Sequence, residues 1–221
     1  MPNKYEFNKS GFTNQIYQII KQKIINLEIK PGSQIDIKNI AKKYDISEAP
    51  VRDALKKLEE KNLVKTKPRV GSFAIKLTSE DIRELYGARK LLELHALREM
   101  INDIKDNDLE KIEKNTNLLL ENGVPEGNKK EWFDKVDENL HKNFIVASTQ
   151  NSYIQNFYED IYDLVRISRH LQQRIEQAAK EHLVIIEGLK NHDLSKAEEA
   201  LGSHLERTKK SALEAKNFDS W

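Results

Sequence analysis

The sequence predicts a mainly α-helical protein with two domains, a small N-terminal domain of three helices and a β-hairpin and a larger all-helical bundle. Four of the five prolines lie before residue 69, and a proline inside a helix costs about 3 kcal/mol. Apolar residues recur at helical spacing on both sides of the change in proline content. We place the boundary near residues 76–79, which gives domains 1–76 and 77–221.

The charges divide at the same boundary. The 221 residues include 37 Lys or Arg and 36 Asp or Glu, a net charge of +1. Residues 1–76 contain 16 basic and 8 acidic side chains, whereas the remainder contains 21 and 28. A basic domain of this size indicates a polyanionic partner, most often nucleic acid. The alternative is a lysine-rich helix face that is only solvated.

Composition excludes several kinds of protein. Cysteine is absent, so thiol catalysis, disulfides and thiolate metal sites are ruled out. The first residues lack the apolar core of a signal peptide, and no apolar run approaches the roughly 20 residues of a membrane span. We therefore expect a cytoplasmic protein that does not enter a membrane.

The N-terminal domain is expected to contain three short helices followed by a hairpin. Ser47 suits the N-cap of the third helix, and Pro50 fits its first turn because the missing N–H is not needed there. The apolar stripe of this helix has helical spacing and consists of Val51, Ala54, Leu55 and Leu58. The expected elements are helices over about 16–27, 37–44 and from residue 47 onward, and strands over 63–66 and 72–75.

The order of these elements predicts a winged helix-turn-helix domain that binds double-stranded DNA. The second helix of such a unit enters the major groove with its N-terminal residues toward the bases. Arg52 suits a bidentate contact to guanine, and the basic tip of the hairpin, with Arg69, Gly71 and Ser72, suits contact with phosphates or the minor groove. A small helical domain solvated by these residues is the alternative. The exposed face of the expected recognition helix carries Ser47, Glu48, Ala49, Arg52 and Lys56.

The C-terminal domain is expected to consist of six helices. Thr78 to Asp81 resembles a capping box, with Asp in place of the usual Glu, and opens a helix that runs to about Met100. Further periodic segments run over about 108–121, 129–148, 151–170, 174–191 and 193–216.

A possible metal site lies in this second domain. Asp137 and His141 are four residues apart, so they face the same way from one helix. Together with His182 and His204 they offer one carboxylate and three imidazoles, a set that suits Zn²⁺ or a related divalent ion. The spacing alone leaves open that these are ordinary core or surface histidines.

Motifs in the first domain identify a family. The motifs are Ile29–Ile35, Ile40-Ala41, Ile46–Glu59, Asn62–Val64 and Gly71–Phe73. Across residues 17–77 the sequence resembles the DNA-binding domain of the GntR family of bacterial transcription regulators. The resemblance implies that Lys38 and Arg52 contact DNA and that Gly71 forms the wing tip.

Two positions depart from the family pattern. Glu48 stands where the family usually has arginine, and Ala49 replaces a common threonine. A glutamate reverses the charge and can accept a hydrogen bond from cytosine N4, so we expect an operator different from the usual one.

Motifs in the second domain extend the resemblance. They are Arg89–Glu93, Asp137–His141 with Leu140 in place of Phe, Asn151, and the segments around His182 and His204. The domain resembles the FCD effector domain, whose metal-binding members use the matching Asp and three His. This implies a divalent ion, zinc foremost, with nickel or manganese as alternatives. It also implies that Arg89 binds a small carboxylate effector, with Arg166 and Arg169 on a helix that lines the cavity or in salt bridges.

The resemblance implies a dimeric regulator, a repressor released by its effector, which reads a pseudo-palindromic operator in the bacterial nucleoid. One alternative is a metal-dependent hydrolase or lyase with a fused DNA-binding domain, which would need a general base beside the metal. Another is a purely structural dimer module.

Overall fold

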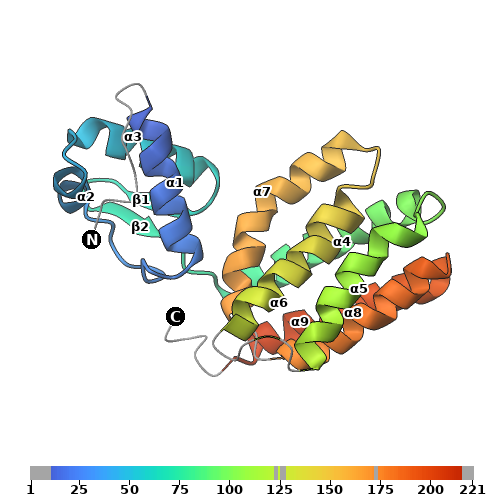
Figure 1. The fold of residues 1–221 in the computed structure, drawn as a ribbon. Coiled ribbons are helices and arrows are strands. Elements are labelled where there is room, and N and C mark those ends of the chain that lie inside the picture. Colours follow the sequence, from blue (N-terminus) through green and yellow to red (C-terminus); the bar gives the residue numbers. More distant parts are fainter. Residues whose placement is uncertain (1–10, 122–123, 125–127, 172–173, 216–221) are drawn as a thin grey trace. The chain divides into compact units, whose positions relative to one another are not determined.

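The computed structural model of the chain describes residues 11–121, 124, 128–171 and 174–215. It divides into two compact units with the boundary between Leu77 and Thr78 (Figure 1). Each unit is described by itself. Among the residues that the structure describes, no helix is long and apolar enough to cross a membrane.

The N-terminal unit contains three helices and a two-stranded antiparallel sheet. α1 and α3 pack together through apolar stripes that include Ile16, Ile20, Leu55 and Leu58, all at most 2% exposed. The stripe expected for the third helix is buried, as predicted. The elements are α1 (Phe12–Ile25), α2 (Ile37–Lys43), α3 (Glu48–Glu60), β1 (Val64–Lys67) and β2 (Gly71–Ala74).

The caps and the hairpin differ in detail from the expectation. Ser47 is at the N-cap of α3, but among the described residues its side chain makes no cap hydrogen bond. Asp36, which the sequence analysis did not identify, caps α2 by accepting from the backbone N–H of Asn39 at 3.0 Å. The strands lie one residue off the expected ranges, with Lys67 paired to Gly71. Gly71 has a φ of +144°, a conformation that residues with a side chain rarely adopt.

The C-terminal unit is a bundle of helices (Figure 1). α8 packs against α5 and α9, and α4 packs against α7 and α9. The elements are α4 (Ser79–Met100), α5 (Asp106–Leu120), α6 (Lys129–Glu138), a π-helical segment (Asn139–Val146), α7 (Ser152–Ser168), a 3₁₀ turn (Arg169–Leu171), α8 (Ile175–Lys190) and α9 (Leu194–Leu213).

Two local features of the sequence determine where α4 begins and how closely α8 packs on α9. The predicted capping box at Thr78 is confirmed, with both of its reciprocal hydrogen bonds to Asp81 present. Gly188 allows α8 to approach α9 closely, because a Cβ there would lie 2.8 Å from the backbone nitrogen of Ala197. The approach brings together the two helices that carry His182 and His204.

The helical segment expected over 129–148 is present from Lys129 to Val146, but it is not one regular α-helix. α6 ends at Glu138, and the chain continues as a π-helix that contains His141. Single turns of π-helix occur often at functional sites, where the extra residue in the turn redirects side chains.

Candidate functional site

Four buried side chains from separate elements of the C-terminal unit meet at one point. Asp137 comes from α6, His141 from the π-helical segment, His182 from α8 and His204 from α9. None is more than 2% exposed, and their ligand atoms all lie within 4.8 Å of one another. We call these four residues the Asp–His cluster.

The distances within the cluster suit a small cation. His141 Nε2 lies 3.2 Å from His182 Nε2, and Asp137 Oδ1 lies 3.7 Å from the first nitrogen and 3.6 Å from the second. Around a tetrahedral zinc ion with bonds of about 2.1 Å, neighbouring ligand atoms lie about 3.4 Å apart. The residues present therefore fit a divalent metal ion without large rearrangement.

Two carboxylates outside the cluster orient its histidines. Glu93 Oε2 lies 2.6 Å from Nδ1 of His141, and Glu181 Oε2 lies 2.9 Å from Nδ1 of His204. A ring that donates its Nδ1–H to a carboxylate keeps the Nε2 lone pair free for a metal. His204 Nε2 is buried without a hydrogen-bond partner among the described residues, as this arrangement requires.

The protonation states also favour metal binding. Burial lowers the pKa of both His182 and His204, so these rings are neutral at pH 7. Burial acts to raise the pKa of Asp137, but the positive charges around it, that of Arg169 first, together outweigh burial, lower this pKa and keep the carboxylate ionised. For Glu93, Arg89 and His141 together overcome the effect of burial and lower the pKa to about 2.

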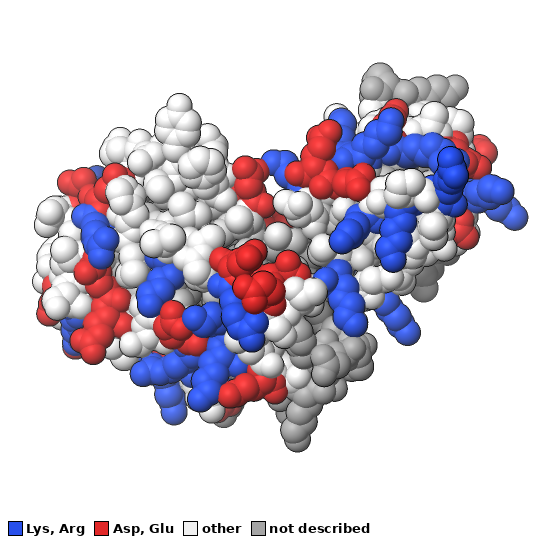
Figure 2. Space-filling model, turned by 180° about the vertical axis from the view of Figure 1, so that it is seen from behind, with Lys and Arg blue, Asp and Glu red and all other residues white. Residues whose placement is uncertain are grey.

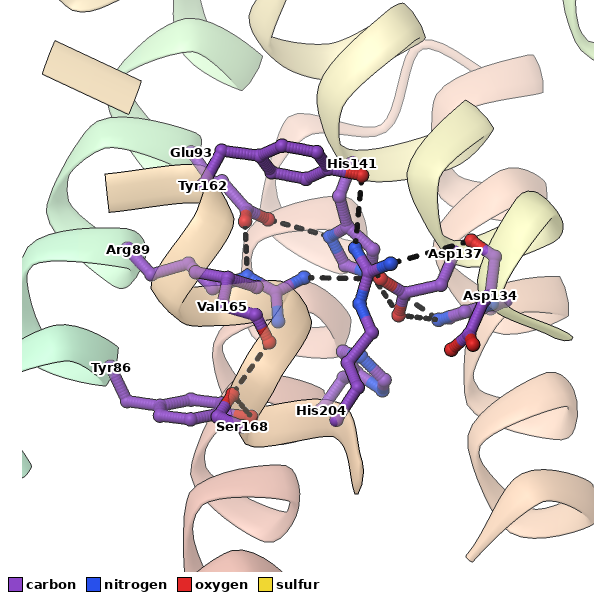
Figure 3. Close-up of polar contacts among 12 residues, drawn as sticks. Tyr86, Arg89, Glu93, Asp134, Asp137, His141, Tyr162, Val165, Ser168 and His204 are labelled. Carbon is purple, nitrogen blue, oxygen red and sulfur yellow. Dashed lines mark hydrogen bonds and ion pairs between the residues drawn. The ribbon is translucent and has the colours of Figure 1, made fainter. Parts of the chain in front are cut away.

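Two buried arginines, Arg89 and Arg169, border the cluster; Figure 3 labels Arg89. Arg169 Nη2 lies 2.7 Å from Asp137 Oδ2, which leaves Oδ1 facing the histidines. Arg89 is fully buried and its Nε donates to Glu93 at 2.5 Å. Arg89 Nη2 lies 3.8 Å from Asp137 Oδ2, beyond hydrogen-bond distance, and among the described residues neither Nη1 nor Nη2 of Arg89 has a hydrogen-bond partner. Guanidinium donors without a hydrogen bond are unusual in a protein interior, because each lost hydrogen bond is costly.

Arg166 is less buried than the other two arginines. Its side chain is partly exposed, and its charge acts on Asp134. Of the three arginines expected at an effector site, the structure thus brings Arg89 and Arg169 against the cluster. Of the two roles expected for Arg169, cavity lining or a salt bridge, the structure shows a salt bridge, with Asp137.

The residues expected to contact DNA surround a groove on the N-terminal unit. The groove, of about 630 Å³, is lined by the start of α2, the start of α3 and the hairpin, and its lining includes Lys38, Glu48, Arg52 and Arg69. Lys and Arg side chains project from much of the visible face of this unit (Figure 2). The exposed residues of the expected set are Lys38, Ser47, Ala49, Arg52, Lys56 and Arg69, while Glu48 and Gly71 are partly buried.

Ser72 is placed differently from the rest of this set. Its side chain is 7% exposed, and its hydroxyl lies 3.2 Å from Thr66 Oγ1 across the hairpin. The hydroxyl thus supports the wing from within and does not face outward.

Comparison with known families assigns both units. The family described as "Bacterial regulatory proteins, gntR family" matches residues 12–74, and the FCD domain matches residues 84–207, more than half of the chain. The chain belongs to the GntR family, with an FCD domain. It is a DNA-binding transcriptional regulator, and the alternative of a hydrolase or lyase is not supported.

Other transcriptional regulators match along most of this chain. An uncharacterised HTH-type transcriptional regulator, YdhC of Bacillus subtilis, is 28% identical over 86% of each chain. The crystal structure of a putative GntR regulator from Rhodococcus sp. RHA1 shares the fold, with a TM-score of 0.74, 22% identity and coverage of 92% of this chain and 98% of that one. The structure of the Zn²⁺-bound FCD domain of TM0439 has a TM-score of 0.56 and 27% identity to this chain, and the match covers 66% of this chain and 99% of that one.

The FCD domain contains supporting residues that the sequence analysis did not single out. Glu93 and Glu181 lie within the motifs, yet only the fold shows that they hold His141 and His204. Tyr158, from α7, donates its hydroxyl to Glu93 Oε1 at 2.8 Å. Arg89 and Glu93 are four residues apart on one helix, and this spacing in the sequence could have predicted their ion pair.

Proposed function

We propose that the Asp–His cluster binds a divalent metal ion, with zinc as the first candidate. The observation that carries this proposal is the meeting of four buried ligand atoms within 4.8 Å, two of them on rings oriented by carboxylates. The FCD domain of TM0439, which is 27% identical, is described in both metal-free and Zn²⁺-bound forms, and this supports the proposal. Nickel and manganese suit the same imidazole and carboxylate donors.

A small carboxylate is the effector class that we propose for this domain. When bound, the ion would supply a Lewis-acidic centre that a carboxylate oxygen could join as an additional ligand beyond the four protein ligands. Arg89 offers two buried nitrogens without hydrogen-bond partners among the described residues, and Arg169 offers a second buried positive charge. Arg166 remains a third proposed contact. Positive groups in a dry site bind an anion more strongly than they would in water.

The regulatory role that we propose is repression by a homodimer on a pseudo-palindromic operator, relieved by the effector. Two-fold symmetry of the protein implies two half-sites in the DNA. The regulator would act at the nucleoid, in the bacterial cytoplasm. The residues proposed to contact DNA are Lys38, Ser47, Glu48, Ala49, Arg52, Lys56, Arg69 and Gly71, with Ser72 supporting the wing.

Thermal unfolding with and without metal tests the metal site. Addition of zinc to chelator-treated protein should raise the melting temperature, since a ligand at about 1,000 times its Kd stabilises the folded state by about 4 kcal/mol. His204→Ala should abolish the increase. His95→Ala is the matched control, because His95 is exposed and pairs only with Glu99 within the described contacts. An equal increase in His204→Ala would contradict the assignment.

Operator binding in the presence of carboxylates tests the regulatory role. A carboxylate that is an effector should weaken operator binding by the zinc-loaded protein, and operator DNA should weaken carboxylate binding by the same factor. A carboxylate that binds yet leaves the operator affinity unchanged is not the effector. If every binding carboxylate behaves in this way, the proposed control is wrong.

A further inference from the structure

An ion pair lies at the start of the recognition helix α3. Glu48 occupies the first helical position and Arg52 follows one turn later. Glu48 Oε2 accepts a hydrogen bond from Arg52 Nη2 at 2.6 Å. Both side chains line the groove between this helix and the wing.

This ion pair should contribute little to the free energy of unfolding. The side chains of Arg52 and Glu48 are 59% and 37% exposed, and ion pairs in such positions contribute little to the stability of a protein. A long arginine side chain otherwise samples many rotamers. The contact with Glu48 restrains it within reach of whatever enters the groove.

The contact leaves Arg52 able to read a base. A guanidinium has five N–H donors in a planar fork, and the contact with Glu48 uses only one of them, on Nη2. The others include pairs with the geometry of guanine O6 and N7. At the same time the carboxylate places a negative charge where phosphates pass, which weakens attraction to any DNA sequence.

We propose that Glu48 is a positioning residue for Arg52, which increases discrimination between DNA sequences while it decreases general affinity for DNA. The inference rests on the proposed function, in which Arg52 reads a base. For Glu48 it replaces the direct contact with DNA named above, including contact with cytosine N4, because the carboxylate acts through the arginine. Glu48 and Arg52 then form one reading unit.

Binding measurements on full-length variants test this inference. Wild-type protein first selects an operator from random duplexes, and a scrambled duplex of the same length serves as the reference. Fluorescence anisotropy at several salt concentrations then gives the affinities of Glu48→Gln, Glu48→Ala, Arg52→Ala and the double variant Glu48→Ala with Arg52→Ala. Glu60→Gln is the matched control, because Glu60 is an exposed acid at the far end of the same helix.

Opposite changes in the two affinities are expected for Glu48→Ala. Its affinity for scrambled DNA should rise about threefold, because one repulsive charge is lost, whereas its operator-to-scrambled ratio should fall about tenfold. In the Arg52→Ala background the same change should produce no further loss of discrimination, because the arginine it positions is gone. Glu60→Gln should change both affinities by the same small factor and so leave their ratio unchanged.

Three outcomes would overturn the inference. Equal increases in affinity for both duplexes would mean that Glu48 is only a repulsive charge. An undiminished loss of discrimination in the Arg52→Ala background would mean that Glu48 contacts a base directly. Full discrimination in Arg52→Ala would show that Arg52 reads no base, and that outcome alone also removes the proposed function of this residue.

Discussion

The two polar sites of this regulator differ first in their exposure to water. In the Asp–His cluster every charge is buried, and each lies against an opposite charge or a polar group from another element. On the N-terminal unit the basic residues expected to contact DNA are exposed, and Arg52 pairs with Glu48 on the same helix. We call these residues the reading face, and they are Lys38, Arg52, Lys56 and Arg69. Substitutions in the cluster should therefore change stability, whereas those on the reading face should change binding alone.

Removal of a buried positive charge should have the largest effect. Arg89→Met leaves the Glu93 carboxylate without its closest positive partner in a fully buried place, which should lower the free energy of unfolding by about 3–5 kcal/mol. Urea denaturation in the presence of chelator measures the change. Arg83→Met on the same helix removes an exposed arginine and should change stability by less than about 0.5 kcal/mol. Similar losses in both variants would break the contrast between buried and exposed charge.

Loss of an orienting carboxylate should weaken metal binding while the four ligands remain. Glu181→Gln removes the charge that holds the His204 ring, and changes of this kind reduce metal affinity about 10- to 100-fold. Competition with a chromophoric chelator measures the affinity. Glu187→Gln is the control on the same helix, since Glu187 pairs with Lys196 at the surface and should leave zinc binding unchanged. Unaltered affinity in Glu181→Gln would show that the ring needs no such support.

The close packing of α8 on α9, the helices of His182 and His204, should not tolerate a larger residue at Gly188. Gly188→Ala places a methyl group against the backbone of Ala197 and should lower the free energy of unfolding by about 1–3 kcal/mol. Gly87→Ala should have the opposite effect, because a Cβ added at this position would have no other atom within 4 Å. Alanine in that exposed part of α4 should stabilise the protein by about 0.5–1 kcal/mol. Denaturation curves that move in the same direction for both variants would contradict the packing described.

A change on the reading face should have the smallest effect on stability. Arg52→Lys keeps the charge but loses the planar fork, so its free energy of unfolding should stay within about 0.5 kcal/mol of wild type. The ratio of operator to scrambled affinity should nonetheless fall about tenfold. If Arg52→Lys lowered the free energy of unfolding and kept the wild-type ratio of operator to scrambled affinity, the expected difference between the two sites would be contradicted.

Sequence reasoning found the parts of both sites that depend on local spacing. The spacing of Asp137 and His141 on a helix, the buried stripe of α3 and the capping box at Thr78 all follow from residues three to seven apart. His182 and His204 were candidates by residue type, and the family resemblance supported them, because they are too far along the chain for spacing to relate them.

What sequence reasoning missed depends on contacts between distant segments. The pairing of Glu181 with the ring of His204 requires the packing of α8 on α9, and the position of Tyr158 against Glu93 requires that of α7 on α4. The extra residue of the π-helix leaves no mark in the apolar pattern, because the periodic residues of 129–148 fit an ordinary helix equally well. The hydroxyl of Ser47 was expected to cap α3 from residue type alone, a preference that the local geometry does not use.

The number of metal ions bound per chain tests the central claim most directly. Titration of metal-free protein with zinc, followed by elemental analysis of the same sample after gel filtration, should give one ion per chain in the wild type and in His95→Ala. Asp137→Ala and His182→Ala should retain none, because each removes one of four converging ligands. A wild-type protein that retains no ion, or variants that retain a full one, would contradict the assignment of this cluster as a metal centre.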